Sequence, residues 1–322
     1  MSMGHDDADE ARLDARAEAA AIARGGVMAD ELAESRGGRG RLWRNRKAVV
    51  SLVLLALLVA VAAFGPLVWT RSGTDVDLLD YTPKAFPSAA HPLGTDSTGI
   101  DTLARLLLGL RTTFEVALFV EAINVILGVG AGILAGYFRG PLDAVLSRVA
   151  DLLFAFPGLL FVIFVAGVFG PAVSSFYGGL GRLLLTAGAL ALVGWPLLAR
   201  YVRGVTLSLR EQEFVLAARA TGVGPGGIIR RHILPNVAGV IVVAATLDVV
   251  GVVSGEATLS LLGLGIQPPG SSLGLMINDA REYLTTNWTQ EFFPCVVLAL
   301  IILLFSFLGD GLRDALDPQR ER

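Results

Sequence analysis

The chain has 322 residues, of which 53% are hydrophobic and only 17% are charged, and its formal net charge is -3 at pH 7. A soluble domain typically carries about 25% charged residues, and the weakly negative charge excludes a basic nucleic-acid-binding protein. The single cysteine, Cys295, excludes an internal disulfide and a CxxC metal motif, and the histidines lie too far apart to suggest a metal cluster. Neither of the two lysines, Lys47 and Lys84, lies in a GxxxxGK[ST] phosphate-binding loop. The composition therefore indicates an integral membrane protein without a nucleotide-driven motor of its own.

Residues 1–40 are rich in Ala, Asp, Glu, Arg and Gly. Residues 9–23 have the composition of a helix. The low content of large apolar side chains nevertheless predicts a solvated, partly disordered tail for residues 1–40 as a whole.

The first membrane-spanning helix is expected within residues 41–69, because residues 48–69 carry no charge. As a helix these 22 residues extend about 33 Å, enough for a bilayer core of about 30 Å. A cleaved signal peptide is the rival interpretation, since Ala60, Val61 and Ala62 resemble a cleavage site. The 47 preceding residues and the long apolar run favour an uncleaved anchor.

Five further apolar stretches bring the expected number of crossings to six. Their lengths and apolar runs are typical of an all-α bundle, because the strands of a membrane barrel would alternate every second residue. They are residues 114–137, 145–169, 183–202, 237–262 and 292–308, and they make up a core over residues 114–308.

The arginines predict the orientation, because cytoplasmic loops carry an excess of positive charge. Arg44 and Arg46 belong to a basic cluster before the first span, and Arg230 and Arg231 lie in the loop between spans four and five. Together with the basic residues of the tail 309–322, they place both termini in the cytoplasm. Residues 70–113 are then external, and an interfacial helix is expected over residues 101–111.

Several glycines have the spacing of helix contacts. Gly128, Gly132 and Gly136 lie on one face of the second span, and Gly251 and Gly255 repeat the spacing in the fifth. Small residues allow membrane helices to approach closely. This contact is made either within the chain or with a second membrane subunit.

Four polar residues inside the expected spans are candidates for lining a translocation pathway. Charges at this depth cost roughly 3 kcal/mol or more and tend to face a cavity or a partner. Glu121 and Asn124 share a face of the second span, and Asp248 and Glu256 share roughly one face of the fifth. Buried structural hydrogen bonding is the equally weighted alternative.

Other features of the spans have more local explanations. Asp151 in the third span lies three residues from Arg148, and a local ion pair is expected. Pro157 and Pro196 are expected to interrupt the third and fourth spans with kinks.

Residues 209–236 carry the most specific pattern, which predicts a helix, a break and a second helix. Glu211 and Glu213 suit a first helical turn, Gly222 suits a helix terminus, and Pro225 suits the start of the next helix. Pro235, followed by Asn236, is expected to separate this second helix from the fifth span. The small side chains near the break predict a surface on which another protein docks.

This loop resembles the EAA motif of ABC-importer permeases. Leu216 stands where the motif has Glu, with Glu213 as the alternative carboxylate one turn earlier, and His232 stands where the motif has Ile. The matching residues are Ala217, Ala218, Gly222, Leu234 and Pro235.

Further segments resemble the C-type permease subunits of dipeptide and oligopeptide importers over about residues 40–318. Ile100 departs from the family's usual arginine. The similar segments are residues 91–96 (HPLGTD), 155–158 (AFPG), 256–269 and 308–318.

The resemblance implies a bundle of six transmembrane helices of the type I, MetI-like importer fold in the bacterial inner membrane, with a cytoplasmic coupling loop. It implies a second homologous permease, cytoplasmic ATPases that carry ATP and Mg, an external solute-binding protein and a peptide substrate. The chain itself is then a translocation subunit rather than an enzyme, and binds no cofactor or metal. Nickel, glutathione and haem are alternative cargoes, and an ion-coupled secondary transporter that uses Glu121 or Glu256 is the rival from another class.

Overall fold

The computed structural model describes residue 43 and residues 45–76 and 81–316. The tail expected over residues 1–40 lies outside this part. The described chain is helical, and its only β pairing is an isolated bridge between Thr95 and Asp101. The all-α expectation is therefore confirmed.

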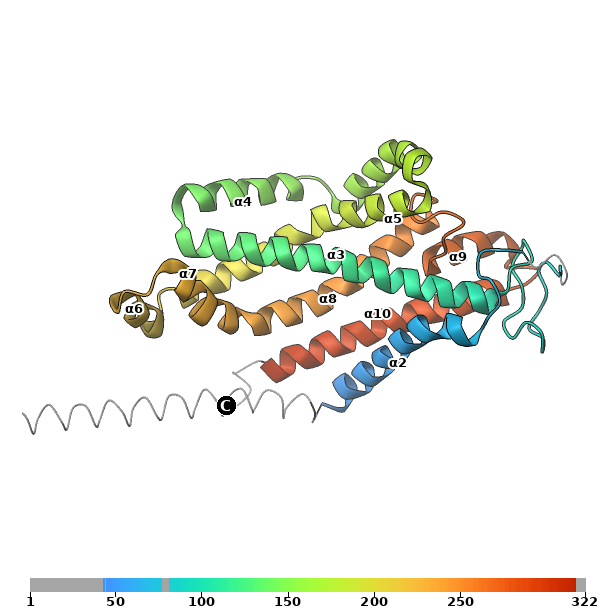
Figure 1. The fold of residues 1–322 in the computed structure, drawn as a ribbon, viewed down its shortest axis with the longest axis horizontal. Helices are drawn as coiled ribbons and strands as arrows, with labels where there is room; N and C mark the ends of the chain where they lie inside the picture. The colour runs from blue at the N-terminus through green and yellow to red at the C-terminus, as the bar shows by residue number, and fades with distance from the viewer. Residues whose placement is uncertain (1–42, 44, 77–80, 317–322) are drawn as a thin grey trace, which may run out of the picture.

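Long apolar helices lie side by side along the long axis of the molecule (Figure 1). Five helices are long and apolar enough to cross a membrane, the fourth of them running from Pro225 through α8. The principal long helices are α2 (Arg46–Val68), α3 (Thr102–Phe138), α5 (Gly158–Leu209), α8 (Leu234–Leu261) and α10 (Thr289–Leu316).

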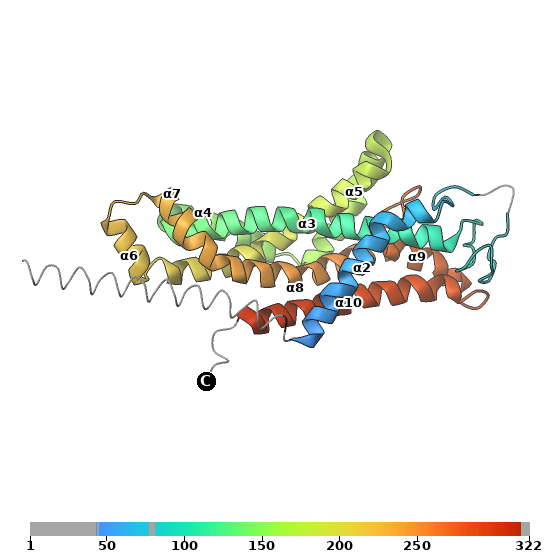
Figure 2. The ribbon, with the colours of Figure 1, turned by 60° about the horizontal axis from the view of Figure 1, so that its bottom comes forward.

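Helix α5 is long enough to hold two of the six expected crossings. It has 52 residues, and Gly178 inside it has non-helical torsion angles of φ 59° and ψ -146°. A positive φ of this kind suits glycine. The first half of α5 stands away from the rest of the bundle (Figure 2), so α5 consists of two apolar segments joined at Gly178.

The third span does not lie where the sequence predicts it. Helix α4 (Gly140–Phe154) ends before Pro157, and α5 begins directly after it, so residues 145–169 do not form one helix. Pro157 therefore marks a helix boundary rather than a kink within a span. Pro196 lies inside α5, where the backbone stays helical.

Helix α4 lies alongside α3 (Figure 1). Its 15 residues are fewer than the roughly 20 that a bilayer crossing needs. Its far end connects to α5 through residues 155–157. We therefore count α4 as a packed helix and not as a span.

Helices α3 and α5 pack through the glycines of α3. A methyl group added to Gly128 would lie 2.9 Å from Leu198, and one added to Gly132 would lie 2.7 Å from Val202. At Gly136 the equivalent contact is Thr206, at 2.8 Å. These three glycines therefore make helix contacts within the chain, which is the first of the two expected alternatives.

The end of the bundle at which α3 begins holds residues 81–101, α9 (Leu273–Ala280) and a single 3₁₀ turn, η2 (Arg281–Tyr283) (Figure 1). The interfacial helix expected over residues 101–111 is not separate, because Thr102 begins α3 and the helix continues to Phe138. Helix α10 likewise extends beyond the expected end of its span, to Leu316.

Candidate functional site

The loop between α5 and α8 forms two short helices at one end of the bundle (Figure 1). Helix α6 (Glu213–Ala220) ends at Thr221, and Gly222 follows with φ 83°. Helix α7 (Pro225–Ile228) then begins with its proline in the first turn. The predicted helix, break and helix are confirmed, and so is the role of Gly222 at the terminus.

One apolar face fixes this loop to the bundle. Val215 of α6 and Ile228 of α7 are buried in one cluster with Ile233, Tyr137 and Val202. The opposite surface is open and combines small side chains with larger ones such as Phe214 and Leu216. Ala217 and Gly222 are exposed there, whereas Ala218 is half-buried against the apolar cluster, and nothing lies within 4 Å of a methyl group added to Gly222.

The remaining residues of the motif surround this open surface. Glu213 lies in the first turn of α6 as predicted, and Leu216, Leu234 and Pro235 are exposed. Glu211 lies before the helix instead of in it, and its carboxylate pairs with Arg139 at 3.0 Å.

Pro235 does not separate the second short helix from the fifth span. Helix α7 continues through a π-helical turn, η1 (Ile229–Ile233), directly into α8. In this turn the Leu234 N–H donates to the carbonyl of Ile229, five residues back. Pro235 lacks the N–H that would bond back into the helix, and the wider π-helical turn directly before it lets the chain continue past the proline without a break. The open surface of the loop is therefore connected to α8 by one continuous helical rod.

A second group of polar residues lies midway along the bundle. Asn124 of α3 is fully buried, and its Nδ2 donates to Oδ2 of Asp248 in α8 at 2.8 Å. Glu121, one turn before Asn124, is 9% exposed and faces the same carboxyl group. The structure thus brings three of the four predicted pathway residues together.

Glu256, the fourth, is separate from this group. It is 1% exposed, and its Oε1 accepts from the Ser260 hydroxyl at 2.7 Å. The Ser272 hydroxyl, at the start of α9, lies 3.3 Å from that of Ser260. Glu256 therefore belongs to a buried chain of side chains that ties α8 to α9.

The local pair expected between Asp151 and Arg148 is replaced by longer-range ion pairs. Asp151 accepts from Arg200 of α5 at 2.6 Å. Asp143 accepts two hydrogen bonds from Arg203, which hold the pKa of that carboxyl below its ordinary value. Two ion pairs thus fasten α4 to α5, and a hollow of about 420 Å³ lies between α3, α4 and α5.

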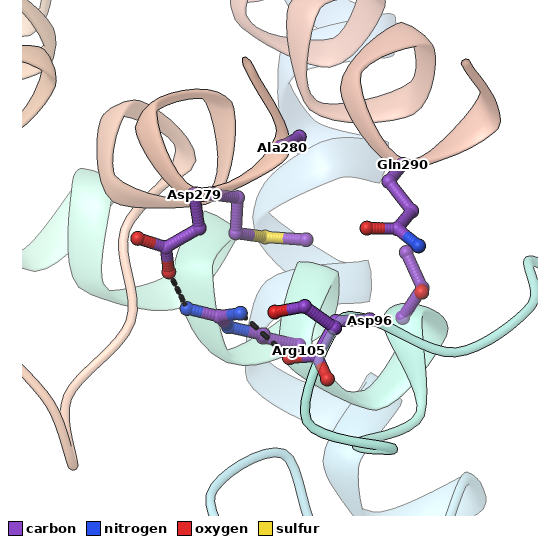
Figure 3. A pocket seen from close by; sticks show the side chains of 8 residues that line it. Asp96, Arg105, Asp279, Ala280 and Gln290 are labelled. Carbon is purple, nitrogen blue, oxygen red and sulfur yellow. Dashed lines mark hydrogen bonds and ion pairs between the residues drawn. The ribbon is translucent and has the colours of Figure 1, made fainter. Parts of the chain in front are cut away.

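The end of the bundle opposite to α6 contains a network that the sequence analysis missed. Arg105 of α3 lies between two carboxylates (Figure 3), pairing with Asp96 at 2.6 Å and also with Asp279 of α9. Gln290 of α10 donates to the Thr95 carbonyl at 2.9 Å. The partners are up to 195 residues apart, so no local pattern could have revealed them.

Long apolar helices, with a polar group at mid-length and an open helical loop at one end, define a polytopic membrane protein. The family model described as "Binding-protein-dependent transport system inner membrane component" matches residues 128–322. A second model, "N-terminal TM domain of oligopeptide transport permease C", matches residues 37–83. The chain therefore belongs to the family of inner-membrane components of binding-protein-dependent transport systems, which are the permease subunits of ABC importers.

Curated relatives align over most of their length. The chain is 36% identical to the "Dipeptide transport system permease protein DppC" of Alkalihalophilus pseudofirmus, over 87% of this chain and 88% of the relative. It is 38% identical to the "Oligopeptide transport system permease protein OppC" of Escherichia coli, over 87% of this chain and 90% of the relative. It is 36% identical to the "Glutathione transport system permease protein GsiD" of Pectobacterium atrosepticum, over 87% of this chain and 89% of the relative.

The fold also resembles a solved structure. A chain of the MetNI methionine ABC transporter, described as showing inward-facing conformations, superposes with a TM-score of 0.51. The superposition covers 65% of the present chain and 95% of the MetNI chain, at 21% sequence identity. The present chain is accordingly a multi-pass membrane permease subunit that works with an ATPase and other subunits, and it is a translocation component rather than an enzyme.

Proposed function

We propose that this permease subunit forms half of a pathway that imports dipeptides or short oligopeptides. The observation that carries this proposal is the similarity to dipeptide and oligopeptide permeases over 87% of the chain. A second cargo, glutathione, is favoured by the similarity to a glutathione permease at 36% identity. Glutathione is itself a short peptide, so both cargoes share ammonium, carboxylate and amide groups.

The partners follow from the two ends of the bundle. A cytoplasmic ATPase docks on the open surface around Gly222, where small residues allow close approach. An external solute-binding protein docks at the opposite end, over α9 and residues 81–101. A homologous second permease completes the pathway. Both termini are then cytoplasmic, and ATP and Mg are held by the ATPases.

The continuous rod from α7 into α8 suits a lever. When the ATPases close on ATP, they pull the loop 211–235, and the rod carries this displacement to Asp248 at mid-length. Hydrolysis lets the ATPases separate and resets the rod. Because α6 joins the rod through residues 221–224, the hinge lies at Gly222 and not at Pro235.

The test is ATP-dependent uptake by the complete complex in reconstituted vesicles. Vesicles are supplied with the cognate binding protein and labelled dialanine or glutathione, with ATP or with a proton gradient alone. We expect dialanine uptake with ATP and none with the gradient. Uptake by the gradient alone would establish a secondary transporter instead. Uptake of glutathione in preference to dialanine would reassign the cargo.

A further inference from the structure

Asp248 presents one of its carboxylate oxygens to an open side of α8. It lies 14 residues from Leu234 and 13 from Leu261, so it is at the middle of the helix. Its Oδ2 is bound by Asn124. Its Oδ1 lies toward Gly251, which is exposed, and a methyl group added there would meet only this oxygen, at 4.0 Å. A ligand can therefore approach Oδ1 over Gly251 without displacing a side chain.

Behind Asp248 lie buried acceptors that have no donor. Within the described chain, no N–H group is placed to donate to either oxygen of the Glu121 carboxyl or to the Asn124 Oδ1, and the Glu121 carboxyl lies directly against that of Asp248. The carboxylates of Glu121 and Asp248 form no ion pair with an arginine or lysine of the described residues. Burying an acceptor without a donor is unfavourable. The group therefore matches a ligand that brings several N–H donors and a positive charge.

Helix α5 holds the acceptors in place. Gly194 packs against Asn124 so closely that a methyl group on it would lie 2.4 Å from the amide nitrogen. The Asn124 amide has no room to turn, and its bond to Asp248 fixes the neighbouring carboxylate. Acceptors fixed in this way do not have to reorganise when a ligand arrives.

The open side of Asp248 must face a polar environment. A carboxylate that faces lipid tails at the middle of the bilayer is costly, whereas one that faces a cavity or a partner is common. In the proposed assembly, this side of α8 faces the pathway shared with the second permease. The inference therefore rests on the proposed function.

We propose that Glu121, Asn124 and Asp248 form a transit site that binds the terminal ammonium group of a peptide during its passage. An ammonium group has three N–H donors and a unit charge. Asp248 Oδ1 receives it from the open side, the Glu121 carboxylate behind Asp248 adds negative charge to the site, and Asn124 holds the Asp248 carboxylate in place. The site requires negative charge, and polarity alone is not sufficient.

The experiment compares variants of the complete reconstituted complex with dialanine as the probe. Asp248→Asn and Glu121→Gln keep the shape and remove the charge, and Asp248→Glu keeps the charge. Glu115→Gln is the matched control, because Glu115 is an exposed residue of α3 that pairs with Arg111. Uptake is measured together with the ATP hydrolysis that the loaded binding protein stimulates, which reports whether the complex is assembled and coupled.

We expect uptake to fall at least about tenfold, which corresponds to about 1.4 kcal/mol, in Asp248→Asn and Glu121→Gln, because each variant removes a charge that the ammonium group requires. Stimulated hydrolysis persists, Asp248→Glu retains uptake within about threefold, and Glu115→Gln matches the wild type. Uptake within about twofold of wild type in Asp248→Asn would overturn the transit site, as would an equal loss in Asp248→Asn and Asp248→Glu. If wild-type complex fails to import dialanine that its binding protein holds, the proposed cargo is wrong, and so is the ammonium ligand.

Discussion

Arg203 and Asp143 form a two-pronged ion pair, with Nε and Nη2 of the arginine 2.6 and 2.8 Å from the two carboxylate oxygens. The pair joins α5 to α4. Only Ala150 of α4 is buried, so the helix has little apolar packing of its own. Its position beside α3 therefore depends on this pair and on Asp151 with Arg200.

Replacing Arg203 with Met should loosen α4. The pair is partly exposed, with 37% of the arginine side chain and 18% of the aspartate side chain accessible, so we expect a loss of about 0.5–1 kcal/mol. The measurement is the thermal unfolding temperature of the purified complex. Arg148→Met is the control, because Arg148 is an exposed arginine of α4 itself. An equal effect of both variants would contradict the anchoring role.

The same pair predicts a pH dependence. Hydrogen bonds from Arg203 lower the pKa of Asp143 in the folded protein, so the folded state favours the charged carboxylate. The stabilisation is then complete above the unfolded pKa of about 4 and is lost as the pH falls through the lower folded value. The difference in unfolding temperature between wild type and Arg203→Met should stay constant from about pH 8 to pH 5. A difference that disappears within this range would show that another group provides the stabilisation.

Gly222 allows the backbone and the surface of the loop to be tested separately. Gly222→Lys adds bulk and charge to a surface with open space around it and strains a φ of 83°. We expect ATPase that co-purifies with the permease to fall at least about tenfold, roughly 1.4 kcal/mol. Gly222→Asn is the control, since asparagine tolerates positive φ at smaller cost. Retention of the ATPase by Gly222→Lys would mean that docking occurs elsewhere.

Helix faces and turn residues could be read from the sequence, but long-range partners could not. The three-residue spacing placed Glu121 and Asn124 on one face correctly, and Gly222 ends its helix as predicted. Asp248 reaches Asn124 across 124 residues, which no helical period encodes. Asp151 pairs with Arg200 rather than Arg148 because packing decides which charges meet.

The misplaced boundaries also have physical reasons. An apolar stretch on either side of Pro157 has the composition of one span, although the chain breaks there into α4 and α5. Pro235 was expected to separate two helices, yet the π-helical turn Ile229–Ile233 carries the helix past it into α8. We expect the sixth crossing within α5, which only the torsion angles of Gly178 divide.

Gly194→Ala should disturb the contact between α5 and Asn124. The added methyl group would lie 2.4 Å from the Asn124 nitrogen, so either the helices separate or the amide turns away from Asp248. We expect a loss of about 1–3 kcal/mol in stability, measured as a lower unfolding temperature of the complex. Gly188→Ala on the same helix is the control, because nothing lies within 4 Å of the added group. Equal stability of the two variants would show that the contact relaxes without cost.

Arg105 should act as a latch at the α9 end. Its side chain is 11% exposed and that of Asp96 is 9% exposed, so Arg105→Met leaves a buried carboxylate without its cation, at a cost of about 3 kcal/mol. We expect faster proteolysis of residues 81–101 and a lower unfolding temperature. Arg111→Met is the control on the same helix, since its pair with Glu115 is more than half exposed. Similar proteolysis rates in the two variants would contradict the latch.

The bend in α5 makes a prediction about topology. Arg182, just after the bend, donates to the carbonyls of Gly265 and Gly263 at 3.1 and 3.3 Å, and both precede α9 in the chain. The bend therefore lies at the α9 end, opposite to α6. If the chain crosses the membrane six times, a cysteine introduced at Gly179 lies outside the cell and one introduced at Thr221 lies inside.

Because Cys295 is the only cysteine in the chain, Cys295→Ser provides a background free of thiols. In that background we expect Gly179→Cys to react with a membrane-impermeant maleimide in intact cells, and Thr221→Cys to react only after the cells are opened. Both positions are exposed, so burial does not explain a failure to react. Labelling of both cysteines from the same side would mean that α5 does not cross the membrane twice, and that the chain has five crossings with its termini on opposite sides.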